Sequence, residues 1–175
     1  MKKFFVIIIS SLICGCLGMP DSVVPVKQFE VDRYLGKWYE IARLDHSFER
    51  GLTNVTAEYR LRSDGGISVL NRGFSEKKGE WQEAKGKAYF VNNPDDGYLK
   101  VSFFGPFYGS YVIFYLDKEN YQYAFVSGPD HSYLWLLSRK PKVEPSVSKA
   151  FKTLSAKLGF NTKNIIWVDQ KGPWE

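Results

Sequence analysis

Short apolar segments, separated by turn-forming residues at nearly regular intervals, fill the chain from Gly36 to Arg139. The separators are rich in Gly, Pro, Asp and Asn, as at 63–66, 93–97 and 128–130, and these residues favour tight turns. Many short strands with such spacing are typical of an all-β sandwich or barrel. The predicted strands cover residues 37–44, 54–62, 66–74, 81–91, 97–104, 110–117, 121–127 and 132–139.

Short connections between eight consecutive strands favour an antiparallel up-and-down meander, which can close into a barrel that holds one small ligand. The aromatic content of 17% supports this prediction, because aromatic side chains favour pleated surfaces. Before the first strand, residues 32–35 can form one helical turn. After the eighth strand, a helix is predicted between Pro145 and Gly159, because apolar residues recur there at helical spacing. A short ninth strand follows at 165–168.

The charged residues predict which face of each strand is turned inward. Lys85, Lys87 and Lys100 are expected to face water, as are Glu58 and Arg60, so that their neighbours face the interior. The resulting mixture of small and aromatic residues describes a cavity better than a solid core. The residues expected to line it are Glu40, Val55, Ala57, Tyr59, Leu61, Ala84, Gly86, Ala88, Phe90, Leu99, Val101, Phe103, Tyr108 and Trp135.

Two of these residues have more than one interpretation. A carboxylate buried at Glu40 needs a partner or a raised pKa, and an internal Tyr or Arg is the simplest partner. Trp135 lies four residues before Arg139 on the same predicted strand, so its side chain should point to the same side and line the cavity. Filling of an ordinary core is the alternative.

The alternation of turns in a meander assigns the two ends of the barrel. Trp38 and Arg139 fall at the same end, so Arg139 is expected to lie on the indole and to bind backbone carbonyl groups near Tyr34 and Leu35. This end is the predicted floor. The opposite end, the predicted mouth, receives the loops 44–53, 75–80, 105–109 and 128–132.

The predicted mouth loops carry the apolar aromatics Phe48, Phe107 and Tyr108, where polar turn residues are the usual expectation. Contact with a ligand, a membrane or a second subunit explains them, and ordinary loop packing is the alternative.

The first sixteen residues predict export and lipidation. A basic start and an apolar run from Phe4 to Ile13 lead to Gly15 and Cys16, which is the layout of a secretory signal. Cys16 resembles the lipidated cysteine of a bacterial lipobox, better than Cys14 does. We therefore expect a signal peptide at 1–15 and a lipidated linker at 16–28. Leu17 follows in place of Asp, which favours the outer membrane; an ordinary signal peptide is the alternative.

Charge and motif content argue against several functions. Of 24 basic residues, two leave with the signal, and the remaining 22 are interspersed with 19 acidic ones, unlike a nucleic-acid-binding surface. The folded part has no cysteine pair for a disulfide or a metal. Its only histidines are His46 and His131. The neighbours Asp45, His46 and Ser47 do not make a catalytic triad, because a triad depends on geometry.

Three segments carry a family resemblance. Residues 36–43, GKWYEIAR, resemble the motif that opens the first strand of lipocalins; residues 120–124 and 136–139 resemble their second and third motifs. The second motif lacks the usual Thr-Asp pair before its Tyr. The similarity covers 29–170, leaves a tail at 171–175, and is greatest to lipid-anchored bacterial lipocalins. The motif residues with an implied structural role are Gly36, Trp38, Tyr121, Tyr123 and Arg139.

The resemblance implies an outer-membrane lipoprotein that binds a fatty acid or a lysophospholipid and serves membrane maintenance. The sequence carries no nucleophile-elbow, phosphate-loop or dinucleotide-binding motif, so we expect no catalysis and no cofactor. A homodimer is a further partner that the mouth aromatics suggest. A lipocalin-fold enzyme acting on a lipophilic substrate and an envelope protein-interaction module are the two alternatives.

Overall fold

A computed structural model describes residues 17–172 of the chain. The predicted signal peptide and Cys16 lie outside these residues. Among the described residues, no helix is long and apolar enough to cross a membrane.

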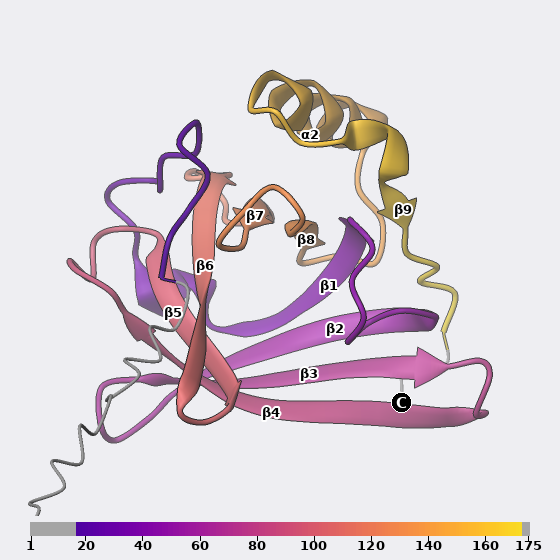
Figure 1. The fold of residues 1–175 in the computed structure, drawn as a ribbon, viewed down its shortest axis with the longest axis horizontal. Coiled ribbons are helices and arrows are strands. Elements are labelled where there is room, and N and C mark those ends of the chain that lie inside the picture. Colours follow the sequence, from indigo (N-terminus) through magenta and orange to yellow (C-terminus); the bar gives the residue numbers. More distant parts are fainter. Residues whose placement is uncertain (1–16, 173–175) are drawn as a thin grey trace, which may run out of the picture.

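The described chain forms a closed antiparallel barrel in which every strand pairs with its neighbours in sequence (Figure 1). Pairing of the first strand with both the second and the eighth closes it. The strands are β1 (Gly36–Arg43), β2 (Leu52–Leu61), β3 (Ile67–Ser75), β4 (Glu80–Phe90), β5 (Tyr98–Phe104), β6 (Phe107–Leu116), β7 (Tyr123–Ser127) and β8 (Leu134–Ser138). The predicted fold is therefore confirmed.

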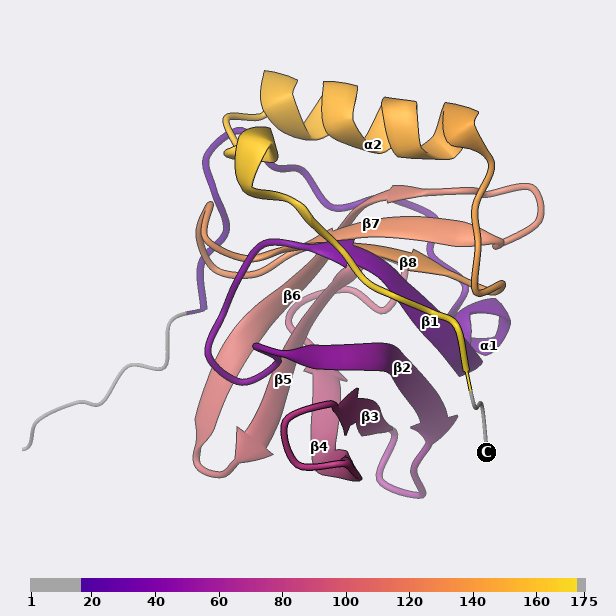
Figure 2. The same ribbon diagram turned by 90° about the vertical axis from the view of Figure 1, so that its right-hand side faces the viewer.

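Three short elements and one longer helix complete the fold. The single turn α1 (Val31–Tyr34) precedes β1, while η1 (Thr162–Asn164) and β9 (Ile166–Trp167) follow α2 (Pro145–Lys157). Proline at the first position of α2 suits a helix start, and Gly159 adopts φ +90° just after its end. Figure 2 shows α2 lying across the outside of the barrel, beside β7.

Two clusters of buried apolar residues stabilise the fold. One lies inside the barrel around Trp38, and the other lies between the outside of the barrel wall and α2. Phe151 is fully buried in the second cluster and packs edge-on against Phe125 of β7 at 5.0 Å. The apolar residues that recur at helical spacing in the sequence thus form the face of α2 that packs against the barrel.

Two details differ from the sequence-based expectation. β6 begins at Phe107 rather than at residue 110, because Phe104 and Phe107 pair across a tight turn at Gly105–Pro106. Phe107 and Tyr108 therefore belong to a strand at a hairpin tip, and not to a loop. Leu61 is 53% exposed at the last residue of β2, so it does not face the interior.

Candidate ligand-binding site

The floor of the barrel is closed by Trp38 and Arg139. Trp38 is fully buried and its Nε1 donates to the Tyr34 carbonyl oxygen at 2.7 Å. The Arg139 guanidinium lies 4.0 Å above the indole ring. Gly36 has φ +89°, a left-handed conformation that glycine adopts without strain, and it lies directly against this guanidinium.

Arg139 also binds three backbone carbonyl oxygens from different segments. Its Nη2 donates to Arg33 at 2.7 Å, its Nη1 to Lys37 at 3.0 Å and its Nε to Tyr121 at 3.4 Å. The expected binding of carbonyl groups near Tyr34 and Leu35 therefore involves Arg33 of α1 and Lys37 of β1, which lie on either side of this pair. One side chain thus joins α1, β1 and the β6–β7 turn.

Of the two tyrosines in the second motif, only Tyr121 reaches the floor. Its hydroxyl accepts from the Glu30 backbone N–H at 3.0 Å, and the Arg33 guanidinium stacks on its ring at 4.1 Å. Tyr123 instead packs outside the barrel, against Tyr115 and Phe125.

The turn before Tyr121 is held by an acidic residue placed earlier than in the usual motif. The Asp117 carboxylate accepts from the backbone N–H of Asn120 at 3.4 Å and of Gln122 at 3.2 Å. Asp117 therefore supplies hydrogen bonds to this turn in the absence of the Thr-Asp pair.

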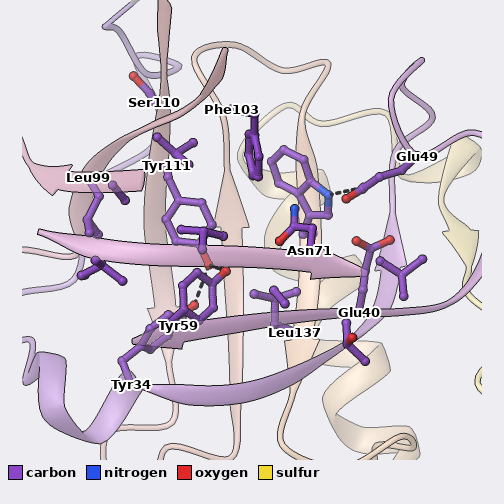
Figure 3. Close-up of a pocket in the computed structure, with 18 of the residues that line it drawn as sticks. Tyr34, Glu40, Glu49, Tyr59, Asn71, Leu99, Phe103, Ser110, Tyr111 and Leu137 are labelled. Carbon is purple, nitrogen blue, oxygen red and sulfur yellow. Dashed lines mark hydrogen bonds between the residues drawn. The ribbon is translucent and has the colours of Figure 1, made fainter. Parts of the chain in front are cut away.

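Above the floor lies a largely apolar chamber of about 110 Å³, called here the inner chamber (Figure 3). Small residues from facing strands, such as Ala57 and Ala88, leave this space open. The wall includes Val55, Ala57, Tyr59, Ile67, Val69, Ala88, Leu99, Val101, Phe103, Trp135 and Leu137.

Three tyrosine hydroxyl groups form a polar cluster at the deep end of the inner chamber. Tyr111 hydrogen-bonds through its hydroxyl to Tyr34 and to Tyr59, each at 2.8 Å. Burial raises the pKa of all three phenols well above the usual value of a tyrosine, and the nearby carboxyl groups of Glu49 and Glu40 raise that of Tyr59 further. The cluster is therefore neutral across the physiological pH range.

A second, wider space of about 530 Å³ lies at the mouth and is called here the outer chamber. It shares Glu49, Val101, Phe103 and Trp135 with the inner chamber, so the two spaces are continuous. The rim of the outer chamber is formed by Phe48, Phe104, Phe107, Tyr108, Pro129 and Tyr133.

Most residues expected to line a cavity do so. In the inner chamber lie Glu40, Val55, Ala57, Tyr59, Ala88, Leu99, Val101, Phe103 and Trp135, while Ala84 and Tyr108 line only the outer chamber. The expectation that Phe90 lines the cavity is wrong, because its ring packs edge-on against Phe29 at 6.1 Å, near the floor. Gly86 makes room for a neighbour: a β-carbon there would meet Phe103 at 2.9 Å.

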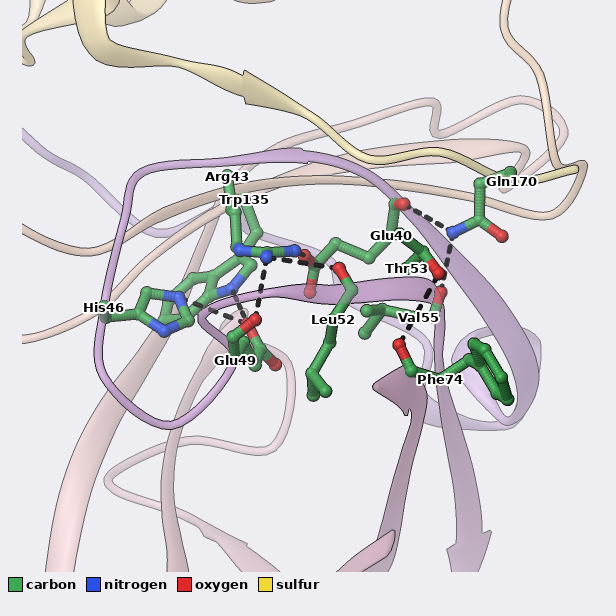
Figure 4. Close-up of polar contacts among 10 residues, drawn as sticks. All are labelled: Glu40, Arg43, His46, Glu49, Leu52, Thr53, Val55, Phe74, Trp135 and Gln170. Carbon is green, nitrogen blue, oxygen red and sulfur yellow. Dashed lines mark hydrogen bonds and ion pairs between the residues drawn. The ribbon is translucent and has the colours of Figure 1, made fainter. Parts of the chain in front are cut away.

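A buried ion pair lies beside the junction of the two chambers (Figure 4). Arg43 Nη1 and Glu40 Oε1 are 2.7 Å apart, and both side chains are almost fully buried. Arg43 Nη2 also donates to the Glu49 carbonyl oxygen at 2.8 Å. Of the two partners expected for Glu40, the structure thus provides the arginine, from the same strand.

Glu49 is the second buried carboxyl group of this cluster. It accepts from Trp135 Nε1 at 3.2 Å, and its Oε2 lies 3.2 Å from His46 Nε2. The His46 ring stacks on Phe48 at 4.0 Å. Burial and the nearby Arg43 lower the pKa of His46 to about 4, so the imidazole is neutral at pH 7. Asp45 binds Arg50 rather than His46, and no triad forms.

Glu40 and Glu49 both favour the protonated form more strongly than an exposed carboxyl group does. Burial raises the pKa of both groups, and the adjacent Glu49 raises that of Glu40 further, whereas Arg43 opposes these effects. Arg43 therefore faces two carboxyl groups that are both biased toward the neutral form, and it is paired with Glu40 at 2.7 Å.

The C-terminal segment seals the wall next to this cluster. β1 and β2 pair only from Gly36 to Tyr39, and beyond this point the side chain of Gln170 bridges them. Its Nε2 donates to the carbonyl oxygens of Glu40 at 2.7 Å and Val55 at 2.8 Å.

Sequence reasoning missed Arg43, Glu49 and the tyrosine cluster. Strict alternation along β1 turns Arg43 outward, but a bulge between Glu40 and Ala42 shifts the register and brings the guanidinium inside. Glu49 lies in a loop, to which alternation does not apply. Tyr111 could have been found, since it lies opposite the inward Leu99 in the β5–β6 pair.

An antiparallel barrel with an apolar interior, closed at one end and open at the other, defines a class of proteins that enclose a small hydrophobic ligand. The model of the lipocalin-like domain matches residues 29–170. The chain belongs to this lipocalin family.

Known proteins with related sequences agree with this assignment. The chain is 67% identical over 171 residues to the outer membrane lipoprotein Blc of Vibrio cholerae, covering 98% of this chain and 100% of the relative. It is 50% identical over 159 residues to Blc of Escherichia coli, and the alignment covers 91% of this chain and 89% of that relative. The structure of insecticyanin from the tobacco hornworm Manduca sexta shares the fold, with a TM-score of 0.68 and 22% sequence identity. The superposition covers 87% of this chain and 86% of insecticyanin.

Proposed function

We propose that this lipocalin binds a fatty acid or a lysophospholipid and carries or stores it for membrane maintenance. The observation that carries the proposal is the continuous pair of chambers with a largely apolar wall, in which the buried Glu40 is paired with Arg43. The acyl tail would run from the inner chamber, against Ala57 and Ala88, into the outer chamber, past Phe103 and Trp135. The polar head would lie in the outer chamber, near Tyr108.

The free energy available from such a tail is sufficient for useful binding. Each methylene removed from water contributes about 0.8 kcal/mol, so a chain of roughly 16 carbons gains about 12 kcal/mol before costs. Association costs of at least ~4 kcal/mol leave about 8 kcal/mol, which corresponds to a micromolar Kd. The narrow inner chamber favours a ligand with one chain over a lipid with two.

The chain is a lipid-anchored outer-membrane protein, as the names of its 67% and 50% identical relatives indicate. For the anchor we propose acylation of Cys16, the first residue after the signal peptide.

Binding without catalysis fits the buried cluster. Glu40 is paired with Arg43, and neither ring nitrogen of the neutral His46 has a hydrogen-bond partner among the described residues, so this imidazole activates no hydroxyl or thiol nucleophile. We therefore propose a carrier and not an enzyme.

The experiment compares two tryptophan substitutions on β4. Ala88→Trp places an indole in the inner chamber opposite Ile67, whereas Lys85→Trp places one on the outer face of the same strand and serves as the matched control. Titration calorimetry with fatty acids and lysophospholipids of increasing chain length measures the affinity of each variant, and native mass spectrometry identifies lipids that co-purify.

We expect affinity to rise with chain length in the parent and in Lys85→Trp, and to fall at least tenfold in Ala88→Trp, since several methylenes lose their site. Equal affinity for all chain lengths, or an Ala88→Trp variant that binds as the parent does, would show that the tail is not inside the barrel. Turnover of a bound lipid would favour an enzyme, and absence of any bound lipid an interaction module.

A further inference from the structure

The tyrosine cluster at the deep end of the inner chamber has more hydroxyl protons than hydrogen bonds. Tyr34, Tyr59 and Tyr111 point their hydroxyl groups toward one another (Figure 3). Burial keeps the phenols un-ionised at neutral pH, so the cluster holds three O–H protons. Two hydrogen bonds join the three groups, from Tyr111 to each of the others, both at 2.8 Å. Whichever hydroxyl donates in each pair, one O–H is left over.

The protein itself does not use this remaining O–H. Within the part of the chain that the structure describes, the three hydroxyl groups make only the two hydrogen bonds just given. The chamber wall around them, which includes Val69 and Leu99, is apolar and offers no acceptor. A buried donor without a partner costs free energy. The O–H is therefore available to a molecule that fills the chamber.

The cluster lies where a ligand that enters through the mouth comes to its end. All three tyrosines line the inner chamber and none of them lines the outer chamber. The Tyr34 ring packs on Trp38 of the floor, with the ring centroids 4.6 Å apart. An acyl tail that enters as proposed above therefore ends against these hydroxyl groups. A terminal methyl group cannot accept the remaining proton.

We propose that the tyrosine cluster is a binding subsite for a neutral oxygen atom near the buried end of the acyl chain. The ligand class is a lysophospholipid or fatty acid whose chain carries a carbonyl or hydroxyl group close to its terminal carbon. The subsite rests on the proposed function, in which the tail enters the inner chamber. It adds a preference for oxygenated chains over plain ones.

A neutral oxygen suits the subsite better than a carboxylate. The described residues that line the inner chamber include no lysine or arginine. Arg139 acts on Tyr34 through its charge, but its guanidinium lies on Trp38 and already donates to three backbone carbonyl oxygens. A buried carboxylate without a cation of its own is costly. A carbonyl oxygen needs only the one donor that is left over.

The test compares two lysophosphatidylcholines of equal chain length. One has a plain acyl chain, and the other carries an oxo group on the carbon before the terminal methyl. Their head group is too large for a space of about 110 Å³, so the chain must enter tail first. Titration calorimetry with the full chain measures both affinities.

Three variants separate the hydroxyl groups from the rings that carry them. The triple variant Tyr34→Phe, Tyr59→Phe, Tyr111→Phe keeps every ring and removes every hydroxyl. Tyr111→Phe alone frees both remaining hydroxyl groups, because each of them is bonded to Tyr111. Tyr98→Phe is the matched control, since Tyr98 is buried between the barrel wall and α2 and lines neither chamber.

We expect the parent and Tyr98→Phe to bind the oxo chain at least as tightly as the plain chain. In the triple variant the oxo chain should weaken by at least about tenfold relative to the plain one, because its oxygen is buried without a donor. Tyr111→Phe should keep the preference for the oxo chain. The same ratio of affinities in the parent and the triple variant would overturn the subsite, as would a Tyr111→Phe variant that loses the preference.

An infrared measurement tests the subsite without any substitution. The oxo group is labelled with carbon-13, so that its stretching band is resolved from the protein bands. In the bound state we expect this band at a lower wavenumber than in an apolar solvent, because a donated hydrogen bond weakens the C=O bond. A band at the apolar-solvent position would overturn the proposal, even if the triple variant failed to fold.

Failure of the subsite and failure of lipid binding are distinguishable. If neither lysophosphatidylcholine binds the parent, the proposed function fails and the subsite fails with it. If both bind equally well and the carbonyl band is that of an apolar solvent, the protein binds lipid and the subsite alone is rejected.

Discussion

Replacement of Arg139 by Met should destabilise the barrel without changing the cavity. The substitution keeps an apolar chain over Trp38 but removes the charge and all five donors. Three carbonyl oxygens lose their partner at distances of 2.7, 3.0 and 3.4 Å, and hydrogen bonds from a charged group contribute about 1.5–3 kcal/mol each when well formed.

The expected magnitude follows from these contacts. Counting the 3.4 Å bond as negligible and discounting the other two for partial exposure leaves about 2–3 kcal/mol. The cation–π contact with Trp38 at 4.0 Å adds about 1 kcal/mol. We expect a loss of roughly 3–4 kcal/mol in total, without a change in ligand affinity.

Urea denaturation of the parent, Arg139→Met and Arg139→Lys measures this loss. Arg139→Lys keeps the charge but not the fork of donors, so it should fall between the two. A double-mutant cycle with Trp38→Phe isolates the cation–π contribution. A loss below ~1 kcal/mol for Arg139→Met would refute the view that this residue closes the floor.

Three further outcomes are expected. Folding lowers the pKa of His46 from 6.5 to about 4, so the unfolded chain takes up a proton first as the pH falls. The free energy of unfolding should therefore decline by up to ~3 kcal/mol between pH 6.5 and pH 4. Urea denaturation of His46→Gln should show a weaker decline. Folding raises the pKa of Glu49 above its ordinary value of 4.5, so stability should fall as the pH rises from 4.5 toward the folded pKa. Glu49→Gln, which resembles the protonated acid, should flatten this decline in the same assay. Cys16→Ser should yield an unlipidated precursor by intact-mass analysis while Cys14→Ser is still processed; acyl chains on the Cys16→Ser protein would reject the assignment.

The strands, the helix and the floor could be predicted from the sequence because each depends on a regular period or a local motif. Alternation placed Ala57, Ala88 and Leu99 inside, and the meander brought Trp38 and Arg139 to one end. These inferences need only the direction of each strand.

The remaining parts of the site depend on departures from that regularity. The bulge after Glu40 turns Arg43 inward, and no residue pattern in β1 announces it. The short turn at Gly105 lengthens β6 and puts Phe107 in a strand. Strand alternation turns Phe90 toward the interior, but Phe90 lies near the floor. There its ring packs against Phe29, which belongs to the segment before β1 and not to the meander.

The bridge made by Gln170 has a consequence for the order of biogenesis. The gap between β1 and β2 is spanned by a residue that follows every strand, assisted by Asp169, whose carbonyl oxygen accepts from Asn54 N at 2.7 Å. A chain that is threaded through the inner membrane from its N-terminus delivers this segment after all eight strands of the barrel. The side wall therefore closes only after the whole meander has crossed, and until then the interior stays open between β1 and β2.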